Sequence, residues 1–345
     1  MNSLDVGILL CAGLGVRLRP LTEVRPKPLL HFFDRPIASW GLEALIEGGV
    51  TTIGANAHHL PESVVDWLRA DVDRYRAEGA GQIRAEVVVE RELLGTGAGA
   101  LGVWKQLGSP RQTTAVINGD VVADFPLEQM MKVHRRTGAV ATMLAIPQLS
   151  GEGAVGLDEK RHFIARLPLL DDVADSPRYE ARHAVSFGGV YILEPEVFDR
   201  LPNTNSCLIR RGLAPMLAEG AVIAVYEHDG FWADLGTARR YLDAGRAVLD
   251  HPDALPGLLP EREHRKWVAD HRTVHPGATL NGPVYIASGA LVEAGATVGP
   301  YAIIGADCVV RSGAEVTDCV AMCGAELRGR VTGQLVAGPR SLRAV

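Results

Sequence analysis

Short apolar runs alternate with amphipathic stretches over the first two thirds of the chain. The apolar runs are rich in Val, Ile and Ala and only five to eight residues long, which is typical of buried strands. The expected strands are 6–10, 51–55, 83–90, 113–117, 139–146 and 222–227. Between them apolar residues recur every three or four positions, the spacing of one helix face. The expected helices are 36–48, 61–79, 95–107, 127–137, 194–201, 207–219 and 236–248. Strands that alternate with helices predict an α/β domain with a doubly wound, mixed or parallel sheet.

A second pattern begins near residue 273, where every sixth residue is large and apolar and the fourth residue after it is small or Val. The large positions are Val274, Leu280, Ile286, Val292, Val298, Ile304, Val310, Val316 and Met322. The others are Ala278, Val284, Ala290, Ala296, Ala302, Cys308, Ala314 and Val320. A period of six predicts a parallel β-helix of hexapeptide repeats with close to three coils.

A proline-rich stretch at 252–260 separates the two patterns and reads as a linker. We therefore expect an α/β domain over 1–245, a linker over 246–272 and the repeat domain over 273–345. Open coil edges and a flat aliphatic face usually need a cap or a partner. Self-association through residues 273–345 is the expected consequence.

Composition narrows the class of protein. The chain has 345 residues, 47% hydrophobic and 22% charged, with a net charge of −6. This balance disfavours binding to nucleic acid or to anionic membranes. The longest strongly apolar run, 6–16, is too short to span a bilayer and has no basic segment before it. Five scattered cysteines fit a reducing compartment, so we expect a cytoplasmic protein.

The stretch 10–29 carries the clearest candidate chemistry. Gly13 and Gly15 follow the first expected strand, and glycines let backbone N–H groups close around phosphate oxygens. Arg17 and Lys27 supply cations for the same oxygens, and the prolines on both sides of Lys27 restrict its backbone. The spacing is not that of a P-loop, and Leu18 stands where a dinucleotide fingerprint needs its third glycine.

The stretch resembles the signature of the sugar-1-phosphate nucleotidyltransferases (NDP-sugar pyrophosphorylases), usually G-G-x-G-T-R-L-x-P-L-T followed by P-K-P. Ala12 replaces the first glycine and Val16 the threonine. The resemblance implies that Arg17 holds the leaving β- and γ-phosphates and that Lys27 acts around the α-phosphorus. It implies nucleotide contacts from the backbone of Leu10, Ala12, Gly13 and Gly15. It also implies that the repeat domain is a left-handed β-helix.

A second glycine-rich segment runs from Glu90 to Gly99. Read alone, it is a strand-to-helix turn with Thr96 near the N-cap. It also resembles the L-G-T-A-G-A segment of the same family, whose backbone lies against the nucleobase. On that reading Glu90, Gly95 and Thr96 belong to the nucleotide site, and Gly95 and Gly97 permit the close approach.

Two aspartates are candidate metal ligands. Asp120 follows an expected strand in Asn-Gly-Asp, and Asp234 lies in a G-x-W-x-D-x-G-T segment before a helix. The carboxyl ends of strands are where α/β sheets place ligands, and carboxylates suit Mg²⁺. An Asx turn is the structural alternative for Asp120. The family resemblance implies that both aspartates hold Mg²⁺ and that Asp120 is catalytic.

The sugar site departs most from the family pattern. Gly153, Gly188 and Gly189 match its glycines near the sugar, but Phe187 replaces an Asn and Glu152 a Tyr. The usual E-K-P is absent, because Pro168-Leu169-Leu170 stand there. The candidate cations in place of its lysine are Arg166, Arg161 and Lys160.

The resemblance implies the reaction NTP + sugar 1-phosphate → NDP-sugar + pyrophosphate. The motifs of this chain most resemble those of the family members that are similar to mannose-1-phosphate guanylyltransferase, which use GTP. Ala12-Gly13 and Phe187 also occur in uridylyltransferase branches, so a UTP enzyme stays open. A catalytically silent homologue that binds NDP-sugar is the third possibility. An acyltransferase site on the repeats is disfavoured, because His275 is the one His within them.

Overall fold

The computed structural model describes residues 4–147, 154–160, 162–166, 183–255, 257–259, 265–269, 274–338 and 340–344. These residues form two compact units. The sheet unit comprises Met1–Gly13, Gly41–Val121 and Phe125–Trp232. The loop-and-stack unit comprises Leu14–Trp40, Val122–Asp124 and Ala233–Val345. Most of the signature stretch 10–29 therefore belongs to the same unit as the C-terminal third of the chain. The expected domain boundary at residue 245 would place them in different domains.

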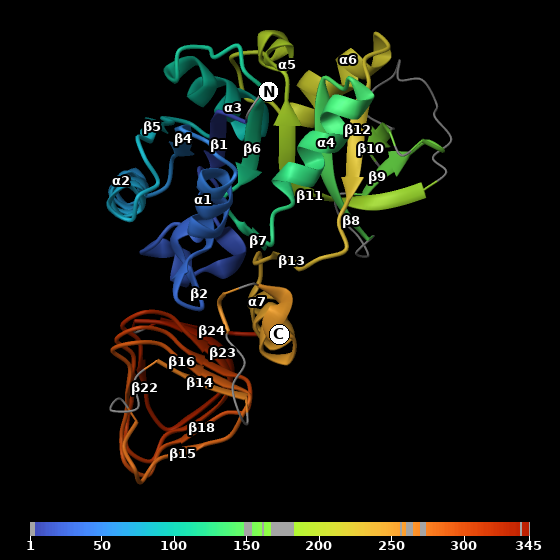
Figure 1. Cartoon of the computed structure of the whole chain (residues 1–345). Helices are drawn as coiled ribbons and strands as arrows, with labels where there is room; N and C mark the ends of the chain where they lie inside the picture. Colours follow the sequence, from blue (N-terminus) through green and yellow to red (C-terminus); the bar gives the residue numbers. More distant parts are fainter. Residues whose placement is uncertain are drawn as a thin grey trace. The chain divides into compact units, whose positions relative to one another are not determined.

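The sheet unit is built on parallel strands (Figure 1). Strand β1 (Val6–Leu10) lies between β4 (Thr52–Ala57) and β6 (Thr114–Asn118) and runs parallel to both. Strand β5 (Arg84–Val89) continues the parallel part beyond β4. Because β1 and β6 run in register, the residues that follow them, from Cys11 and from Gly119 on, emerge at the same edge of the sheet.

The other half of the sheet is mainly antiparallel. Strand β11 (His183–Leu193) pairs antiparallel with β6, β8 (Ala141–Pro147) and β9 (Ala154–Leu157). Strand β10 (Phe163–Arg166) pairs with β9, and β12 (Ile223–Glu227) lies parallel to β8. The sheet is therefore mixed, as the alternation of strands and helices predicted.

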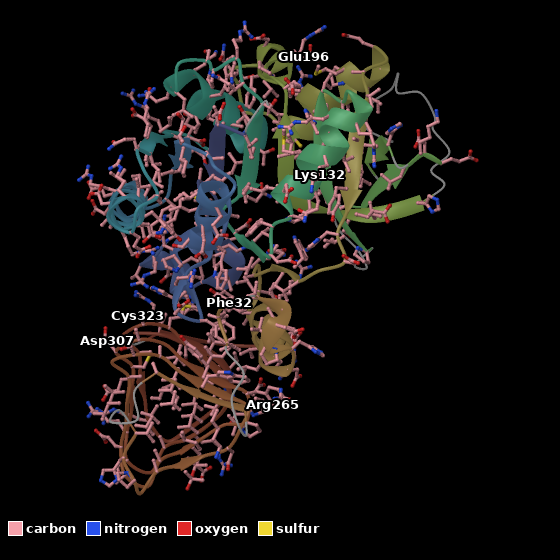
Figure 2. All side chains as sticks on the ribbon, in the orientation of Figure 1. Phe32, Lys132, Glu196, Arg265, Asp307 and Cys323 are labelled. Atoms are coloured by element: carbon pink, nitrogen blue, oxygen red, sulfur yellow. The ribbon has the colours of Figure 1, made fainter. Side chains whose placement is uncertain are left out.

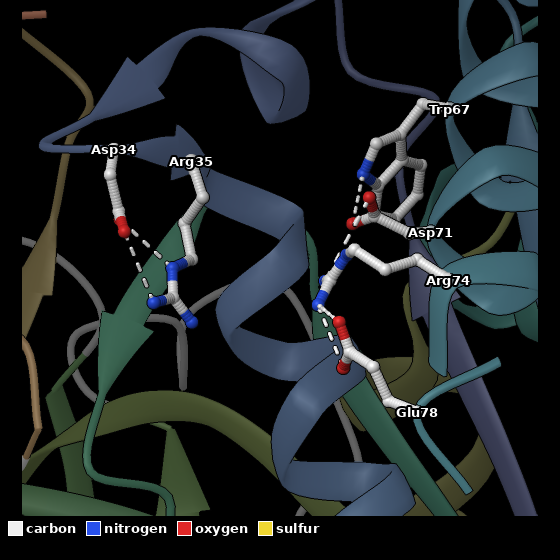
Figure 3. A network of polar contacts seen from close by, with 6 residues as sticks. All are labelled: Asp34, Arg35, Trp67, Asp71, Arg74 and Glu78. Carbon is white, nitrogen blue, oxygen red and sulfur yellow. Dashed lines mark hydrogen bonds and ion pairs between the residues drawn. The ribbon is translucent and has the colours of Figure 1, made fainter. Parts of the chain in front are cut away.

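Helices flank this sheet close to their expected positions. They are α1 (Ile37–Glu47), α2 (Pro61–Ala77), α3 (Gly95–Gln106), α4 (Leu127–Thr137), α5 (Pro195–Arg200) and α6 (Ala214–Ala218). A π-helical turn at Leu208–Leu213 leads into α6. Figure 3 shows polar contacts along α2. The Trp67 indole N–H donates to Asp71, and the Arg74 guanidinium donates to Glu78. None of the described helices is long and apolar enough to cross a membrane.

The loop-and-stack unit begins with three short 3₁₀ turns, Val16–Leu18, Leu21–Glu23 and Lys27–Leu29. A small hairpin of β2 (His31–Phe32) and β3 (Arg35–Pro36) follows. Asp34 at its tip pairs with Arg35 of β3 (Figure 3). The Arg35 guanidinium also lies over the Trp40 ring, 4.6 Å from its centroid. Further along the chain, β13 (Trp232–Asp234) pairs with β7 (Val121–Ala123), and α7 (Ala238–Asp250) follows it.

The C-terminal part is a region of short, mostly parallel strands, here called the strand stack (Figures 1 and 2). Its strands are β14 (Lys266–Val268), β15 (Thr279–Leu280), β16 (Val284–Ile286), β17 (Leu291–Val292), β18 (Thr297–Val298), β19 (Ala302–Ile304), β20 (Val309–Val310), β21 (Glu315–Ala321), β22 (Glu326–Leu327), β23 (Arg330–Ala337) and β24 (Arg340–Arg343). Residues about one predicted coil apart pair in parallel, as Val284 does with Ala302. β24 turns back antiparallel onto β23. β14 lies inside the predicted linker.

The interior of the strand stack follows the six-residue pattern up to Val316 and then shifts. We expected Val320 and Met322 at the last two positions, but Cys319 and Ala321 join the core cluster instead. The cause is the register: Ala302 pairs with Cys319, one residue earlier than a period of 18 requires. Because side chains alternate along a strand, a shift of one residue places Val320 on the outer face.

Candidate active site

Gly15 begins the first 3₁₀ turn of the signature stretch 10–29, Val16–Leu18. Its φ of +60° is a left-handed conformation that favours glycine. A Cβ at this position would lie 2.9 Å from Thr22 Cγ2 and 3.0 Å from Lys27 Cβ, so the missing side chain lets three parts of the loop meet. The Thr22 hydroxyl donates to the Gly15 carbonyl oxygen at 2.9 Å. The packing of Gly15 against Thr22 and Lys27 thus fixes the position of the Lys27 backbone within the loop.

Lys27 and Asp234, which are 207 positions apart in sequence, form an ion pair. Lys27 Nζ donates to Asp234 Oδ1 at 3.2 Å, and the lysine side chain is only 8% exposed. The second carboxylate oxygen accepts from Arg240 Nη1 at 2.5 Å. Asp234 itself is 23% exposed, so the ion pair remains accessible from solvent.

Arg17 belongs to the same group of charges. A Cβ on Gly236 would lie 2.7 Å from Arg17 Nη2 and 3.0 Å from Asp234 Oδ1. The absence of a side chain at Gly236 therefore lets the guanidinium and the carboxylate approach the same point of the backbone. Lys27 and Arg240 pair with the Asp234 carboxylate, and Arg17 lies beside Gly236, so positive charge exceeds negative charge here and suits a polyphosphate.

Arg240 was not predicted from the sequence. It lies in the first turn of α7, whose N-cap is Thr237, and that turn contains no acidic residue. Helix N-termini favour acidic side chains because of the helix dipole, so two arginines there carry an electrostatic cost. That mismatch was the signal that could have singled out Arg240.

Asp120 follows β6 in the sheet unit, next to a tightly packed turn. A Cβ on Gly119 would lie 2.6 Å from Cys11 Sγ and 3.0 Å from the Leu10 carbonyl oxygen. Burial, with the charge of Asp120 as the second cause, raises the pKa of the Cys11 thiol. The thiol therefore stays neutral and acts as a packing group behind the turn. A shared ion between Asp120 and Asp234 would join the two units and stays a prediction.

Glu90 has a structural role that the sequence did not predict. Asn56 accepts the Cys11 backbone N–H at 2.7 Å and donates to Glu90 Oε1 at 2.6 Å. Glu90 Oε2 accepts the Leu94 N–H at 3.0 Å, and the carboxylate is buried. Glu90 thus connects the start of the signature stretch to the second glycine-rich segment. Contact between Glu90 and a nucleotide stays a prediction.

The glycines at 95 and 97 are explained by packing within the protein. A Cβ at Gly95, where φ is +72°, would lie 2.6 Å from the Ser206 carbonyl oxygen, and one at Gly97 would lie 2.7 Å from Ser206 Oγ. The Thr96 hydroxyl accepts the Leu208 N–H at 3.1 Å. The space that we assigned to a nucleobase beside these glycines is filled by the segment at Ser206. Contact of Gly95 and Thr96 with a nucleotide stays a prediction.

The predicted sugar residues are only partly described. Gly188 and Gly189 lie where the pairing of β11 with β8 shifts between Phe187 and Tyr191. The Trp232 indole N–H donates to the Gly188 carbonyl oxygen at 2.8 Å. Gly189 has a φ of +81°. Gly153, Arg161 and the stretch 168–170 lie outside the described residues. The side chain of Arg166 is not described either.

Comparison with known proteins decides the family. The sequence model of the family described as nucleotidyl transferase matches residues 6–251, which include every predicted site residue. The chain belongs to the nucleotidyl transferase family. It is 28% identical over 324 residues to a probable mannose-1-phosphate guanylyltransferase 3 of Oryza sativa subsp. japonica, covering 93% of this chain and 82% of the relative. It is 30% identical over 280 residues to a mannose-1-phosphate guanyltransferase of Debaryomyces hansenii, covering 80% and 71%.

A third relative of this nucleotidyl transferase has another nucleotide in its name. It is a UTP–glucose-1-phosphate uridylyltransferase of Synechocystis sp., 28% identical over 326 residues, covering 91% of this chain and 81% of the relative. The alignments with all three relatives are long and similarly strong. Membership of the family of sugar-1-phosphate nucleotidyltransferases is thus confirmed, and the alignments favour no single base or sugar.

Proposed function

We propose that this nucleotidyl transferase moves a nucleotidyl group from an NTP to a sugar 1-phosphate, with GTP and mannose 1-phosphate as the first pair to test. The observation that carries the proposal is the pairing of Lys27 and Arg240 with Asp234, with Arg17 beside Gly236, in which Lys27 is held by a loop with the family signature. The names of the rice and yeast relatives support the choice of pair.

No side chain needs to act as a nucleophile in this reaction. A phosphate oxygen of the sugar 1-phosphate attacks the α-phosphorus, and the bond from the α-phosphorus to the bridging oxygen breaks, so pyrophosphate leaves. Arg17 holds the leaving β- and γ-phosphates, and Lys27 neutralises charge around the α-phosphorus. The backbone from Leu10 to Gly15 contacts the nucleotide. Catalysis is therefore positioning plus charge neutralisation.

We further propose Mg²⁺ as the cofactor, held by Asp120 and Asp234. The available ligands are carboxylate oxygens, which suit Mg²⁺, and the buried, neutral Cys11 thiol beside Asp120 offers no competing soft ligand. When bound, the ion would neutralise phosphate charge. Asp234 carries two protein cations, so the ion would compete with Lys27 and Arg240 for the carboxylate oxygens.

The strand stack is, on this proposal, a left-handed β-helix of hexapeptide repeats. The parallel pairing of successive coils and the aliphatic interior support it. Self-association through residues 273–345 and a cytoplasmic location stay predictions. An uncovered aliphatic face of the strand stack was one reason to expect self-association. Part of that face is covered by α7 of the same unit, which weakens this reason.

A panel of the four NTPs against several sugar 1-phosphates, with pyrophosphate release as the readout, tests the proposed function. GTP with mannose 1-phosphate should give the highest kcat/KM. UTP with glucose 1-phosphate is the second candidate, because of the uridylyltransferase relative. If full-length protein binds NDP-sugar but turns over no pair, the silent homologue replaces the enzyme.

A further inference from the structure

The strand stack has an apolar outer stripe that runs across its strands. Tyr285, Ile303, Val320 and Leu335 pair in register from β16 to β23. The residues on both sides of Tyr285, Ile303 and Val320 belong to the interior cluster, as does Val336 beside Leu335, so these four side chains point outward. Ile303, Val320 and Leu335 are nonetheless at most 2% exposed. Something outside the strand stack therefore covers this outer stripe.

Helix α7 is the first cover. A Cβ on Gly245 would lie 2.7 Å from Ile303 Cδ1, so this glycine lets the helix backbone approach the outer stripe closely. Arg246 adds a two-pronged ion pair to Asp318, with N–O distances of 2.8 and 2.6 Å. α7 begins four residues after Asp234.

The β2–β3 hairpin is the second cover. The ring of Phe33 packs edge-on against Tyr285, with centroids 5.2 Å apart and an interplanar angle of 75°. Phe33 has a φ of +59°, which is uncommon for a bulky residue and needs packing to hold it. Phe32, labelled in Figure 2, contacts Phe33 and Tyr241 of α7. The hairpin begins two residues after the turn that carries Lys27.

The two covers are also tied to each other. The Tyr241 hydroxyl donates to the His31 carbonyl oxygen at 2.9 Å. Burial, with the charge of Asp34 at the hairpin tip as the second cause, raises the pKa of Tyr285. A separate link between Arg340 and Glu23 is long, at 3.9 Å, and exposed, so it contributes little.

We propose that the outer stripe positions the Lys27–Asp234 pair, with Phe33 and Tyr285 as positioning residues that touch no substrate. Each partner of the pair is followed within a few residues by an element that packs on the outer stripe, the hairpin for Lys27 and α7 for Asp234. The strand stack is then part of the catalytic apparatus and more than an accessory domain. This inference rests on the proposed function for its catalytic consequence, and its structural half can be tested without turnover.

The test uses the full chain with Tyr285→Ala, Tyr285→Phe and Phe33→Leu. Assays run at a temperature where thermal unfolding shows every variant folded. Tyr285→Ala should lower kcat about 10- to 100-fold, because small misplacements of charge-neutralising groups cost this much. KM should change less than about twofold, since these groups act mainly on the transition state. Tyr285→Phe, which keeps the ring, should restore wild-type kcat.

The matched control is Leu291→Ala, an exposed aliphatic residue on β17, a strand outside the outer stripe. It should leave kcat unchanged. A folded Tyr285→Ala with wild-type kcat overturns the proposal. If Tyr285→Ala does not fold, Phe33→Leu carries the same test, because it keeps an apolar side chain and loses the ring contact.

Hydrogen exchange separates failure of this inference from failure of the proposed function. Tyr285→Ala should speed amide exchange in 16–36 and 234–250, and Leu291→Ala should not. Unchanged exchange in both segments overturns the proposal even if the enzyme is active. Faster exchange in a protein that turns over no substrate pair leaves the positioning intact and removes the proposed function.

Discussion

Gly15→Ala is the substitution whose cost is best defined by the structure. An alanine at a φ of +60° costs about 1–2 kcal/mol, and the new Cβ would crowd Thr22 and Lys27 at 2.9 and 3.0 Å. Overpacking of this kind costs about 1–3 kcal/mol, and the stiffer unfolded chain returns about 0.4–1 kcal/mol. We expect a net destabilisation of about 1–5 kcal/mol, or about 2–18 °C in Tm for a domain of this size.

The same crowding displaces Lys27, so kcat/KM should fall about 10- to 100-fold in protein that is still folded. Gly13→Ala is the matched control, because its φ lies outside the left-handed region and none of the described atoms lies within 4 Å of its Cβ position. Thermal unfolding should show Gly13→Ala within about 1 °C of wild type. The reasoning is refuted if Gly15→Ala keeps wild-type Tm and kcat/KM, or if Gly13→Ala is equally destabilised.

Three further substitutions test other parts of the site. Lys27→Ala should lower kcat far more than Tm, because the ammonium acts on phosphate; a large drop in Tm with full activity per folded molecule would make Lys27 structural. Arg240→Ala should lower the Mg²⁺ concentration that gives half-maximal rate, since it removes a competing cation; an increase would show that Arg240 supports the metal site. Gly95→Ala should cost about 2–4 kcal/mol in urea unfolding, because its Cβ meets the Ser206 carbonyl oxygen. Gly102→Ala, in the interior of α3 with only a distant contact, should be neutral or slightly stabilising.

Six strands of the sheet unit were predicted from the sequence, because strong periods of two or 3.6 and the hydrophobic pattern set their positions and register. Strand β11 was not among the expected strands, although it pairs with β6, β8 and β9. The expected helix at 127–137 has the same bounds in the structure. The last coil of the strand stack was wrong by one residue, because the coil at Cys319 is shorter and a fixed period cannot show this.

The site was predictable where a residue's chemistry is local. Gly15 and Lys27 stand out in the sequence, and the structure shows why the loop needs both. Arg240 and Tyr285 were missed, because their roles depend on partners far away in sequence. The packing of the Ser206 segment beside Gly95 was not predictable, since a turn glycine in a sequence does not reveal which atoms fill the space beside it.

The proposed reaction requires Asp120 and Asp234 to act as one metal-dependent site. Pyrophosphate release should be measured in wild type, Asp120→Asn, Asp234→Asn and the double mutant across a Mg²⁺ titration. Each single mutant should lose at least about 100-fold in kcat, and the double mutant should be little worse, because groups that act as a unit are non-additive. Nucleotide binding without metal should survive in all three mutants. Near wild-type turnover in both single mutants would contradict the account.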